Sequence, residues 1–320
     1  MKKTVPTIRD VAAAAQVSIA TVSKYVNGAQ RFSPAVESAL DAAIAALGYT
    51  ANPLAKSMIT GRSDAVGLVL PDLDDPRAGG ILRGAGRVAG EHGLALLLGA
   101  TRGALAARVD GMLLLAGAGA DEQEVPGAGK PVVLVGGPAS SPLPGVAGDE
   151  RAGAAMLARH LCMLGHRRIA YLGLPTLAAD GARIDGMRAV LAQAGLALTV
   201  IDADGDAAAE GARLCAGIVL GERRPDALVC RHDLVALAFM QEATRLGLRL
   251  PREMSVAGFG NVAGGQYATP ALTTLDPLDE RIGALAMDKL LAMLRGAAVE
   301  QHTLVTPQPV LRASTAARSG

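Results

Sequence analysis

Residues 7–28 have the sequence TIRDVAAAAQVSIATVSKYVNG, which predicts two short helices joined by a tight turn. Thr7 and Ser18 each precede residues with helical periodicity, and Thr and Ser are favoured as caps of helix N-termini. Asn27-Gly28 is a stop and turn signal. A helix pair of this kind forms a helix-turn-helix, whose second helix enters the major groove of DNA. Helix pairs are common in proteins, so this pattern alone predicts only a second helix that begins after Ser18 and ends near Val26.

A third helix and a local excess of positive charge complete this N-terminal unit. Ser33-Pro34 is a cap followed by proline at the first helical position, and an apolar stripe then continues to Leu47 before Gly48. The net charge of the chain is only +1, but residues 1–62 carry seven basic and three acidic residues. A basic head on a mildly acidic body fits a polyanion-binding module, and a solvated charged face has the same composition.

The pattern changes after a polar connector at residues 50–63. Short apolar runs then alternate with amphipathic helical stretches, which predicts parallel sheets covered by helices on both faces. Nine expected strands suit two lobes better than one. We expect strands at 66–70, 94–98, 112–115, 132–135, 169–173, 198–202, 227–230, 255–259 and 272–275, and helices that include 151–164, 183–194, 233–246 and 279–294.

Composition and motifs argue against several classes of protein. No apolar run approaches the roughly 20 residues of a membrane span, and no apolar stretch follows Lys2-Lys3 as a signal peptide would require. The cysteines are Cys162, Cys215 and Cys230, an odd number without a CxxC pair, so buried thiols are expected rather than disulfides or a metal site. We expect a cytoplasmic protein.

Cofactor and catalytic motifs are also missing in the contexts that they require. Gly84–Ala89 fits a dinucleotide pattern but lies inside an amphipathic stretch, and Gly127–Lys130 is followed by Pro131 where a phosphate-binding loop needs Ser or Thr. No GxSxG or HExxH occurs. We therefore expect no cofactor, no metal and no catalytic residues, and the chain is not expected to be an enzyme.

Ordered motifs begin within the first two helices and continue along the chain. They include Val17-Ser18, Thr21–Asn27, Leu47–Tyr49, Val109–Gly111, Leu164–Ile169, Gly247-Leu248, Ser255-Val256 and Leu272–Thr274. This series resembles the LacI/GalR (lactose-repressor) family of transcriptional regulators. The resemblance implies an all-α helix-turn-helix head with a hinge helix, and an α/β core of two parallel-sheet lobes like that of periplasmic binding proteins.

The resemblance also implies which residues contact DNA. Base-reading positions fall on Ile19, Ala20 and Lys24, while Thr7, Ser18, Thr21, Ser23 and Asn27 would contact phosphates or cap helices. The match continues into the connector at Asn52 and Ala55, and the hinge helix would span about residues 53–59. Met58 stands where the family usually wedges a leucine into the minor groove, and its alternative role is packing on the core. Gln16 replaces the usual turn glycine.

By the same resemblance a small ligand binds between the lobes, at the carboxyl ends of the strands. The implied effector residues are Asp72, Asp75, Arg77, Asp149, Arg183, His232, Asp233 and Asn261. Asp72 and Asp75 are equally well explained as loop or cap residues. Arg183 could be a surface arginine, but Arg183 and Gly186 at the start of a helix match the ligand-arginine pattern of the family, which favours a ligand role. Gly258-Phe259-Gly260-Asn261 is similar to the branch of the family that senses sugar acids such as gluconate. A sugar or sugar acid is therefore the expected effector.

These expectations define domains and partners. The head is expected at 1–50, the hinge at 51–63 and the core at 64–320, with lobe 1 at about 64–165 plus 278–303 and lobe 2 at about 166–277 plus 304–320. A homodimer binding palindromic double-stranded operator DNA is expected, because one recognition helix contacts too few bases for specificity. The alternative is a solute-binding protein or a sugar-metabolising enzyme with a helical appendage. The crossover at residues 99–110 leaves room for a helix of about two turns at most.

Overall fold

The computed structural model describes residues 6–28, 30–50, 61–116, 129–203 and 207–318. The chain divides into two compact units. One comprises residues 1–65 with 108–110, and the other comprises residues 66–107 with 111–320. The predicted hinge residues Asn52, Ala55 and Met58 lie outside the described residues.

The N-terminal unit contains the predicted helices α1 (Ile8–Ala14), α2 (Ile19–Val26) and α3 (Pro34–Leu47). Its small core is built from Val11, Val22 and Leu40, which are fully buried. The turn between α1 and α2 holds Gln16 at a φ of 54°. This is the left-handed region, where a non-glycine residue costs about 1 kcal/mol. The predicted departure from glycine therefore falls at a position that requires a positive φ.

The first lobe of the core is a six-stranded sheet with the order β11-β5-β4-β3-β1-β2. Helices α5 (Ala78–Glu91) and α11 (Asp279–Leu294) cover one face, packing on alternate residues of the central strands. The short crossover contains only the five-residue helix α6 (Arg102–Ala106). The strands are β1 (Ala65–Val69), β2 (Ala95–Gly99), β3 (Gly111–Leu115), β4 (Val132–Val135), β5 (Gly145–Gly148) and β11 (His302–Val305).

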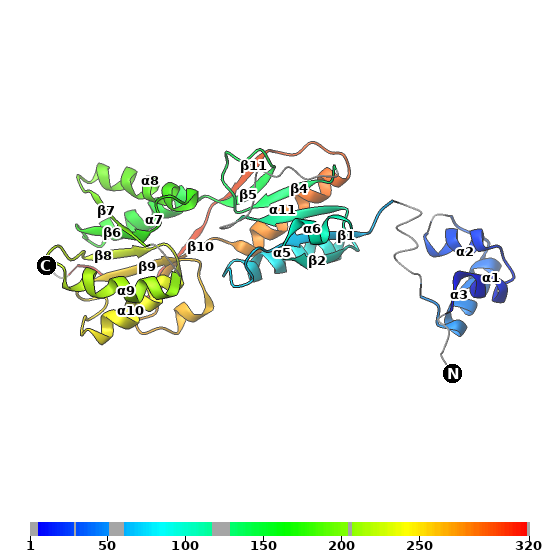
Figure 1. The fold of residues 1–320 in the computed structure, drawn as a ribbon, viewed down its shortest axis with the longest axis horizontal. Coiled ribbons are helices and arrows are strands. Elements are labelled where there is room, and N and C mark those ends of the chain that lie inside the picture. The colour runs from blue at the N-terminus through cyan, green and yellow to red at the C-terminus, as the bar shows by residue number, and fades with distance from the viewer. Residues whose placement is uncertain (1–5, 29, 51–60, 117–128, 204–206, 319–320) are drawn as a thin grey trace. The chain divides into compact units, whose positions relative to one another are not determined.

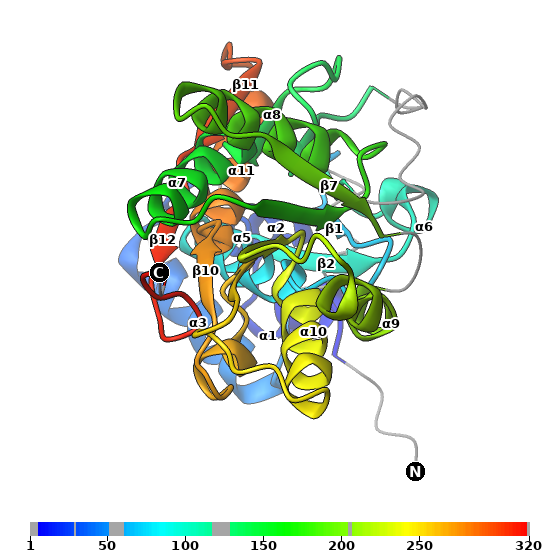
Figure 2. The same cartoon turned by 90° about the vertical axis from the view of Figure 1, so that its left-hand side faces the viewer.

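The second lobe repeats this order as β12-β10-β9-β8-β6-β7, and β12 is antiparallel to β10. Helices α7 (Glu150–Met163) and α8 (Ala178–Gln193) lie on one side of the sheet, with α9 (Ala207–Leu220) and α10 (Asp233–Arg245) on the other (Figures 1 and 2). A 3-10 turn, η1, spans Ala263–Gln266. The strands are β6 (Ile169–Gly173), β7 (Leu198–Asp202), β8 (Ala227–Cys230), β9 (Ser255–Phe259), β10 (Thr273–Asp276) and β12 (Gln308–Val310).

The position of α7 corrects the expected lobe boundary at residue 165. Its buried face, which includes Leu157 and Leu161, shares a core with Tyr171 of β6 and Met187 of α8. The second lobe therefore begins at α7, directly after β5. A helix that follows a strand can cover either lobe when the chain crosses between them, so its sequence pattern alone does not assign it.

The helix pair α5/α11 is closely packed through glycine. A Cβ built on Gly84 would overlap the Glu280 carbonyl oxygen and lie 2.8 Å from the Ala284 backbone nitrogen. A Cβ on Gly283 would likewise meet the Ile81 carbonyl oxygen. Absence of side chains at these two positions lets the helix backbones touch, which holds α11 against the helix that follows the first strand of the lobe.

Candidate DNA-reading head and interlobe ligand site

Helix α2 presents the predicted base-reading residues to solvent. Ile19 is 47% exposed, although it is a large apolar residue, and Ala20 and Lys24 are exposed beside it. Val22, on the opposite face, is fully buried in the head. Burial of a small apolar face thus orients the helix so that the residues near its start remain available to a DNA groove.

Several residues predicted to contact phosphates also hold the helix ends. The Ser18 hydroxyl accepts a hydrogen bond from the Thr21 backbone N–H at 3.0 Å, which caps α2. The Asn27 amide donates to the Ser23 carbonyl at 2.8 Å. The Thr7 hydroxyl and backbone N–H both donate to Asp10 at 2.7 Å, and this interaction lowers the pKa of Asp10. These contacts establish the capping roles; the phosphate contacts remain predictions.

The two sheets of the core have the same point of strand-order reversal. It lies between β1 and β3 in the first lobe and between β6 and β8 in the second. In open parallel sheets ligands bind outside the carboxyl ends of the strands at this switch point. The residues that follow these four strands are therefore the first place to look for a binding site.

Arg77 occupies the switch point of the first lobe. Its guanidinium forms a two-point ion pair with Asp75, with distances of 3.0 Å from Nε to Oδ1 and 2.6 Å from Nη2 to Oδ2. Nη2 also donates to the carbonyl of Ala116, directly after β3, at 2.8 Å. Burial lowers the pKa of Arg77, but the Asp75 carboxylate more than offsets this, so the pKa is raised overall. Arg77 thus pairs with Asp75 of its own loop and reaches across the switch point to the end of β3, while the ligand-binding role of both residues remains a prediction.

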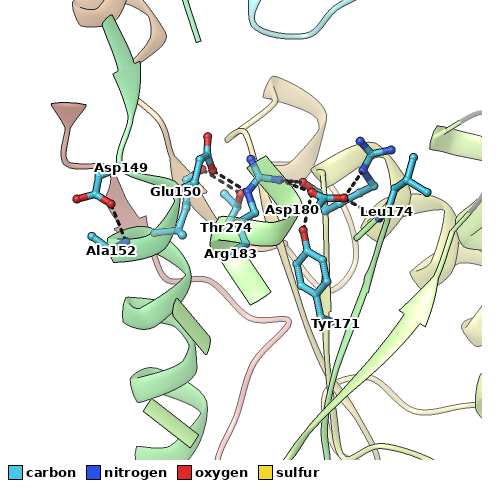
Figure 3. Close-up of polar contacts among 10 residues, drawn as sticks. Asp149, Glu150, Ala152, Tyr171, Leu174, Asp180, Arg183 and Thr274 are labelled. Atoms are coloured by element: carbon cyan, nitrogen blue, oxygen red, sulfur yellow. Dashed lines mark hydrogen bonds and ion pairs between the residues drawn. The ribbon is translucent and has the colours of Figure 1, made fainter. Parts of the chain in front are cut away.

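Arg183 occupies the switch point of the second lobe (Figure 3). Its Nη1 donates to the carbonyl of Arg231, directly after β8, at 2.6 Å, and lies 3.4 Å from Asp180 Oδ1. Asp180 is 1% exposed and also accepts from the Tyr171 hydroxyl at 2.8 Å and the Leu174 N–H at 2.6 Å. The carboxylate therefore ties β6 and the loop after it to the arginine.

The start of α7 brings a further acid to Arg183. Asp149 caps the helix by accepting from the Ala152 N–H at 2.9 Å, so this predicted effector residue has a structural role. The next residue, Glu150, lies 2.6 Å from Arg183 Nε through its Oε2 (Figure 3). The Arg183 guanidinium also lies 4.2 Å from the centre of the Phe259 ring, a cation–π contact.

Charged groups of both lobes interact electrostatically at this place. His232 interacts with Arg77 of the other lobe as well as with Arg183, and Arg77 interacts with Glu150. Burial, with Arg231 and Arg183 adding to it, lowers the pKa of His232 to about 4. We call the residues that share these interactions the interlobe charge cluster; they are Asp75, Arg77, Glu150, Asp180, Arg183, Arg231, His232 and Asp279.

Asp279, at the start of α11, is an acid of this cluster whose pKa is strongly raised. Burial raises its pKa to about 7, Arg77 opposes the shift, and Asp75, Asp276 and Glu150 add to it. Asp279 also lines a groove of about 1060 Å³ between α5, α11 and the loop after β9, together with Asn261 and Asp276. The groove thus begins beside the charge cluster, but Arg183 and His232 are not among the residues that line it.

Two predicted effector residues, Asp233 and Asn261, form hydrogen bonds within the fold rather than offering free polar groups. Asp233 has no exposed surface, and its carboxylate accepts from the Thr274 hydroxyl at 2.6 Å and the Val262 N–H at 2.9 Å. The Asn261 amide donates to Asp276 at 3.0 Å and accepts from Arg312 at 2.7 Å. For Asp233 the prediction of a ligand-facing carboxylate is corrected, because burial directs this group into the fold.

Asp72 forms its hydrogen bond within its own turn and not with the charge cluster. It is exposed, and its carboxylate accepts from the Asp74 N–H at 2.9 Å within its own turn. This geometry matches the alternative that Asp72 is an ordinary loop acid.

Sequence reasoning missed four members of the cluster. Glu150 follows the predicted Asp149, Asp180 stands three residues before Arg183, and Arg231 precedes His232. Two signals would have found the first three of these residues. Glu150 and Arg231 are charged residues next to predicted ligand residues, and Asp180 is one helical turn before Arg183. Asp279 offered no such signal, because it comes close to Arg77 only through the packing of α5 on α11.

Comparisons with known proteins agree with this fold. A model of bacterial regulatory proteins of the lacI family matches residues 7–52, and one of a periplasmic binding protein-like domain matches residues 158–315. The HTH-type transcriptional regulator CelR of Thermobifida fusca is 31% identical, over 94% of this chain and 95% of the relative. The HTH-type transcriptional repressor CytR of Escherichia coli (strain K12) is 29% identical, over 99% of this chain and 98% of the relative.

Solved structures show the same fold. The lac repressor dimer bound to operator and the anti-inducer ONPF superposes with a TM-score of 0.88 at 25% identity, covering 98% of this chain and 99% of that one. The CelR–cellobiose complex has a TM-score of 0.70 at 28% identity, covering 97% and 99%. In the part of the chain that the structure describes, no helix is long and apolar enough to cross a membrane. The helix-turn-helix head, the paired lobes and these relatives together show that this chain belongs to the LacI family and is a transcriptional regulator.

Proposed function

We propose that the chain is a cytoplasmic repressor that binds a palindromic operator as a homodimer and whose affinity for DNA is controlled by a small sugar or sugar acid bound between the lobes. The observation that carries the proposal is the pair of arginine–carboxylate contacts at the two switch points, Arg77–Asp75 and Arg183–Glu150, in a chain that also exposes a recognition helix. A guanidinium donates hydrogen bonds and a carboxylate accepts them, so the two together can pair with the hydroxyl groups of a polyhydroxyl ligand.

The solved relatives support both halves of the proposal. One is described as a complex with cellobiose, and another as a dimer bound to operator DNA. Exposed Ile19, Ala20 and Lys24 supply base-edge contacts on one half-site, and a second head doubles the number of bases read.

Control of DNA binding is proposed to act through the connector. A hinge helix of about seven residues is too short to persist alone in water, so it would form only against the partner's hinge and the minor groove. Met58 would then be the apolar wedge. A ligand shifts this equilibrium only by its different affinity for the two arrangements of the lobes.

Selection from random double-stranded DNA tests the proposed operator binding directly. We expect enrichment of a palindrome bound with about nanomolar affinity and release or tightening of that complex by a member of a sugar and sugar-acid panel. Recovery of no preferred sequence would contradict the repressor assignment. A dimer cross-linked by a disulfide near Met58 tests the hinge, because a full ligand response in that dimer would show that the signal takes another route.

A further inference from the structure

The arginines of the interlobe charge cluster are already neutralised by acids of the chain itself. Arg77 lies 2.6 Å from Asp75, and Arg183 lies 2.6 Å from Glu150. Arg231 Nε lies 3.1 Å from Asp180 Oδ2, an ion pair in which the N–H is not directed at the oxygen. Each arginine of the cluster therefore faces a carboxylate before any ligand arrives.

The remaining titratable groups add no positive charge. His232 is neutral at neutral pH, since burial lowers its pKa to about 4. Asp279 adds a partial negative charge, since burial raises its pKa only to about 7. Counting Arg77, Arg183 and Arg231 against the acids Asp75, Glu150, Asp180 and Asp279, the cluster is close to neutral or negative. A ligand carboxylate would meet acids of its own sign, and such contacts are strongly unfavourable.

Glu150 is the acid that a ligand beside Arg183 would meet. Its side chain is 28% exposed, whereas Asp180, the other acid on Arg183, is 1% exposed and is held by Tyr171 and Leu174. A hydroxyl group can accept from a guanidinium and donate to a carboxylate at the same time, whereas an ionised carboxylate can only accept. Alternating arginine and carboxylate groups thus match neighbouring hydroxyls and do not match a sugar acid.

We infer that the effector of this site is an uncharged polyhydroxyl compound and that Glu150 is the specificity-determining residue that excludes sugar acids, because its carboxylate is paired with Nε of the Arg183 guanidinium. The inference rests on the proposed function, in that it takes the charge cluster to be the effector site. It narrows the ligand class away from the sugar acids suggested by the Gly-Phe-Gly-Asn motif at residues 258–261.

Matched pairs of neutral sugar and aldonic acid test the inference on the full-length protein. D-glucose is compared with D-gluconate, D-galactose with D-galactonate, D-ribose with D-ribonate and cellobiose with cellobionate, by thermal shift and then by calorimetry. Ligands that bind the native state raise the melting temperature. In the wild type we expect a neutral member to bind roughly tenfold or more tightly than its acid partner.

Charge-removing variants then identify the cause. Glu150→Gln should reduce the ratio of the affinity for a neutral sugar to the affinity for its acid by roughly tenfold, or reverse that ratio. Glu222→Gln removes the same charge from an exposed residue before the amino end of β8, away from the carboxyl ends of the strands. It should leave the preference for the neutral sugar over its acid unchanged. Asp75→Asn, which frees Arg77 on the other lobe, is the second variant and should favour acids in the same direction, so the test stands even if one variant folds poorly.

The outcomes separate the inference from the proposed function. An acid that binds the wild type more tightly than its neutral partner overturns the inference and leaves an effector site in place. An unchanged preference in both Glu150→Gln and Asp75→Asn overturns the assignment of the excluding role to these acids. If no member of the panel binds the wild type or any variant, the proposed sugar-controlled function fails, and the inference fails with it.

Discussion

The substitution Gly84→Ala should separate α5 from α11 and destabilise the first lobe. A Cβ at this position would overlap the Glu280 carbonyl oxygen and lie 2.8 Å from the Ala284 nitrogen, so the obstacle is backbone that cannot rotate away. Overpacking costs about 1–3 kcal/mol, and because the obstacle here is backbone we take the upper end, about 3 kcal/mol. Alanine returns about 1 kcal/mol through its better helix propensity. We expect a net loss of about 2 kcal/mol in the free energy of unfolding.

Gly90→Ala in the same helix is the matched control. Nothing lies within 4 Å of a Cβ built on Gly90, so only the propensity gain of up to about 1 kcal/mol should remain. Urea denaturation followed by circular dichroism measures both variants, and the two should differ by about 3 kcal/mol. Equal stabilities for Gly84→Ala and Gly90→Ala would refute the close backbone contact between α5 and α11.

Three further predictions concern DNA reading, pH and the anchoring of the core. Lys24→Ala should weaken operator binding by about 1–3 kcal/mol, and an equal loss on random DNA in a gel-shift titration would instead indicate a phosphate contact. Burial raises the pKa of Asp279 from 3.8 to about 7, so the folded chain binds a proton at Asp279 more tightly than the unfolded chain does. The stability that this bound proton contributes is lost as pH rises from about 4 to about 7. The wild type should therefore lose stability relative to Asp279→Asn between about pH 4 and pH 7, and parallel denaturation profiles would contradict this. Asp110 accepts from the Ser63 N–H at 2.7 Å, the Ser63 hydroxyl at 2.9 Å and the Asp64 N–H at 3.1 Å, so Asp110→Ala should speed hydrogen exchange at these two amides, and unchanged exchange would show that another group holds them.

Local patterns were enough to predict the head and most of the core. Ser18 caps α2, and Pro34 begins α3 after its Ser33 cap, because these signals act on the residues next to them. The nine expected strands are all present as strands, since each has a short apolar run, although the edge strands β2 and β7 carry exposed and half-buried residues. Three short strands were missed. β5 has the sequence GVAG, β11 is HTLV and β12 is QPV, so none shows a continuous run of large apolar residues.

The candidate site was likewise predicted in part from the sequence and completed only by the tertiary structure. The family resemblance carried by the sequence placed Asp75, Arg77, Arg183 and His232 in the predicted site, and in the fold each of them follows a strand, where ligands bind in open parallel sheets. Only the tertiary structure decided that Asp233 turns inward to Thr274, that α7 joins the second lobe and that Glu150 reaches Arg183 across 33 residues of chain. The reason is physical: caps and periodicity depend on neighbours within a few residues, whereas burial and ion pairing depend on which segments the sheets bring together.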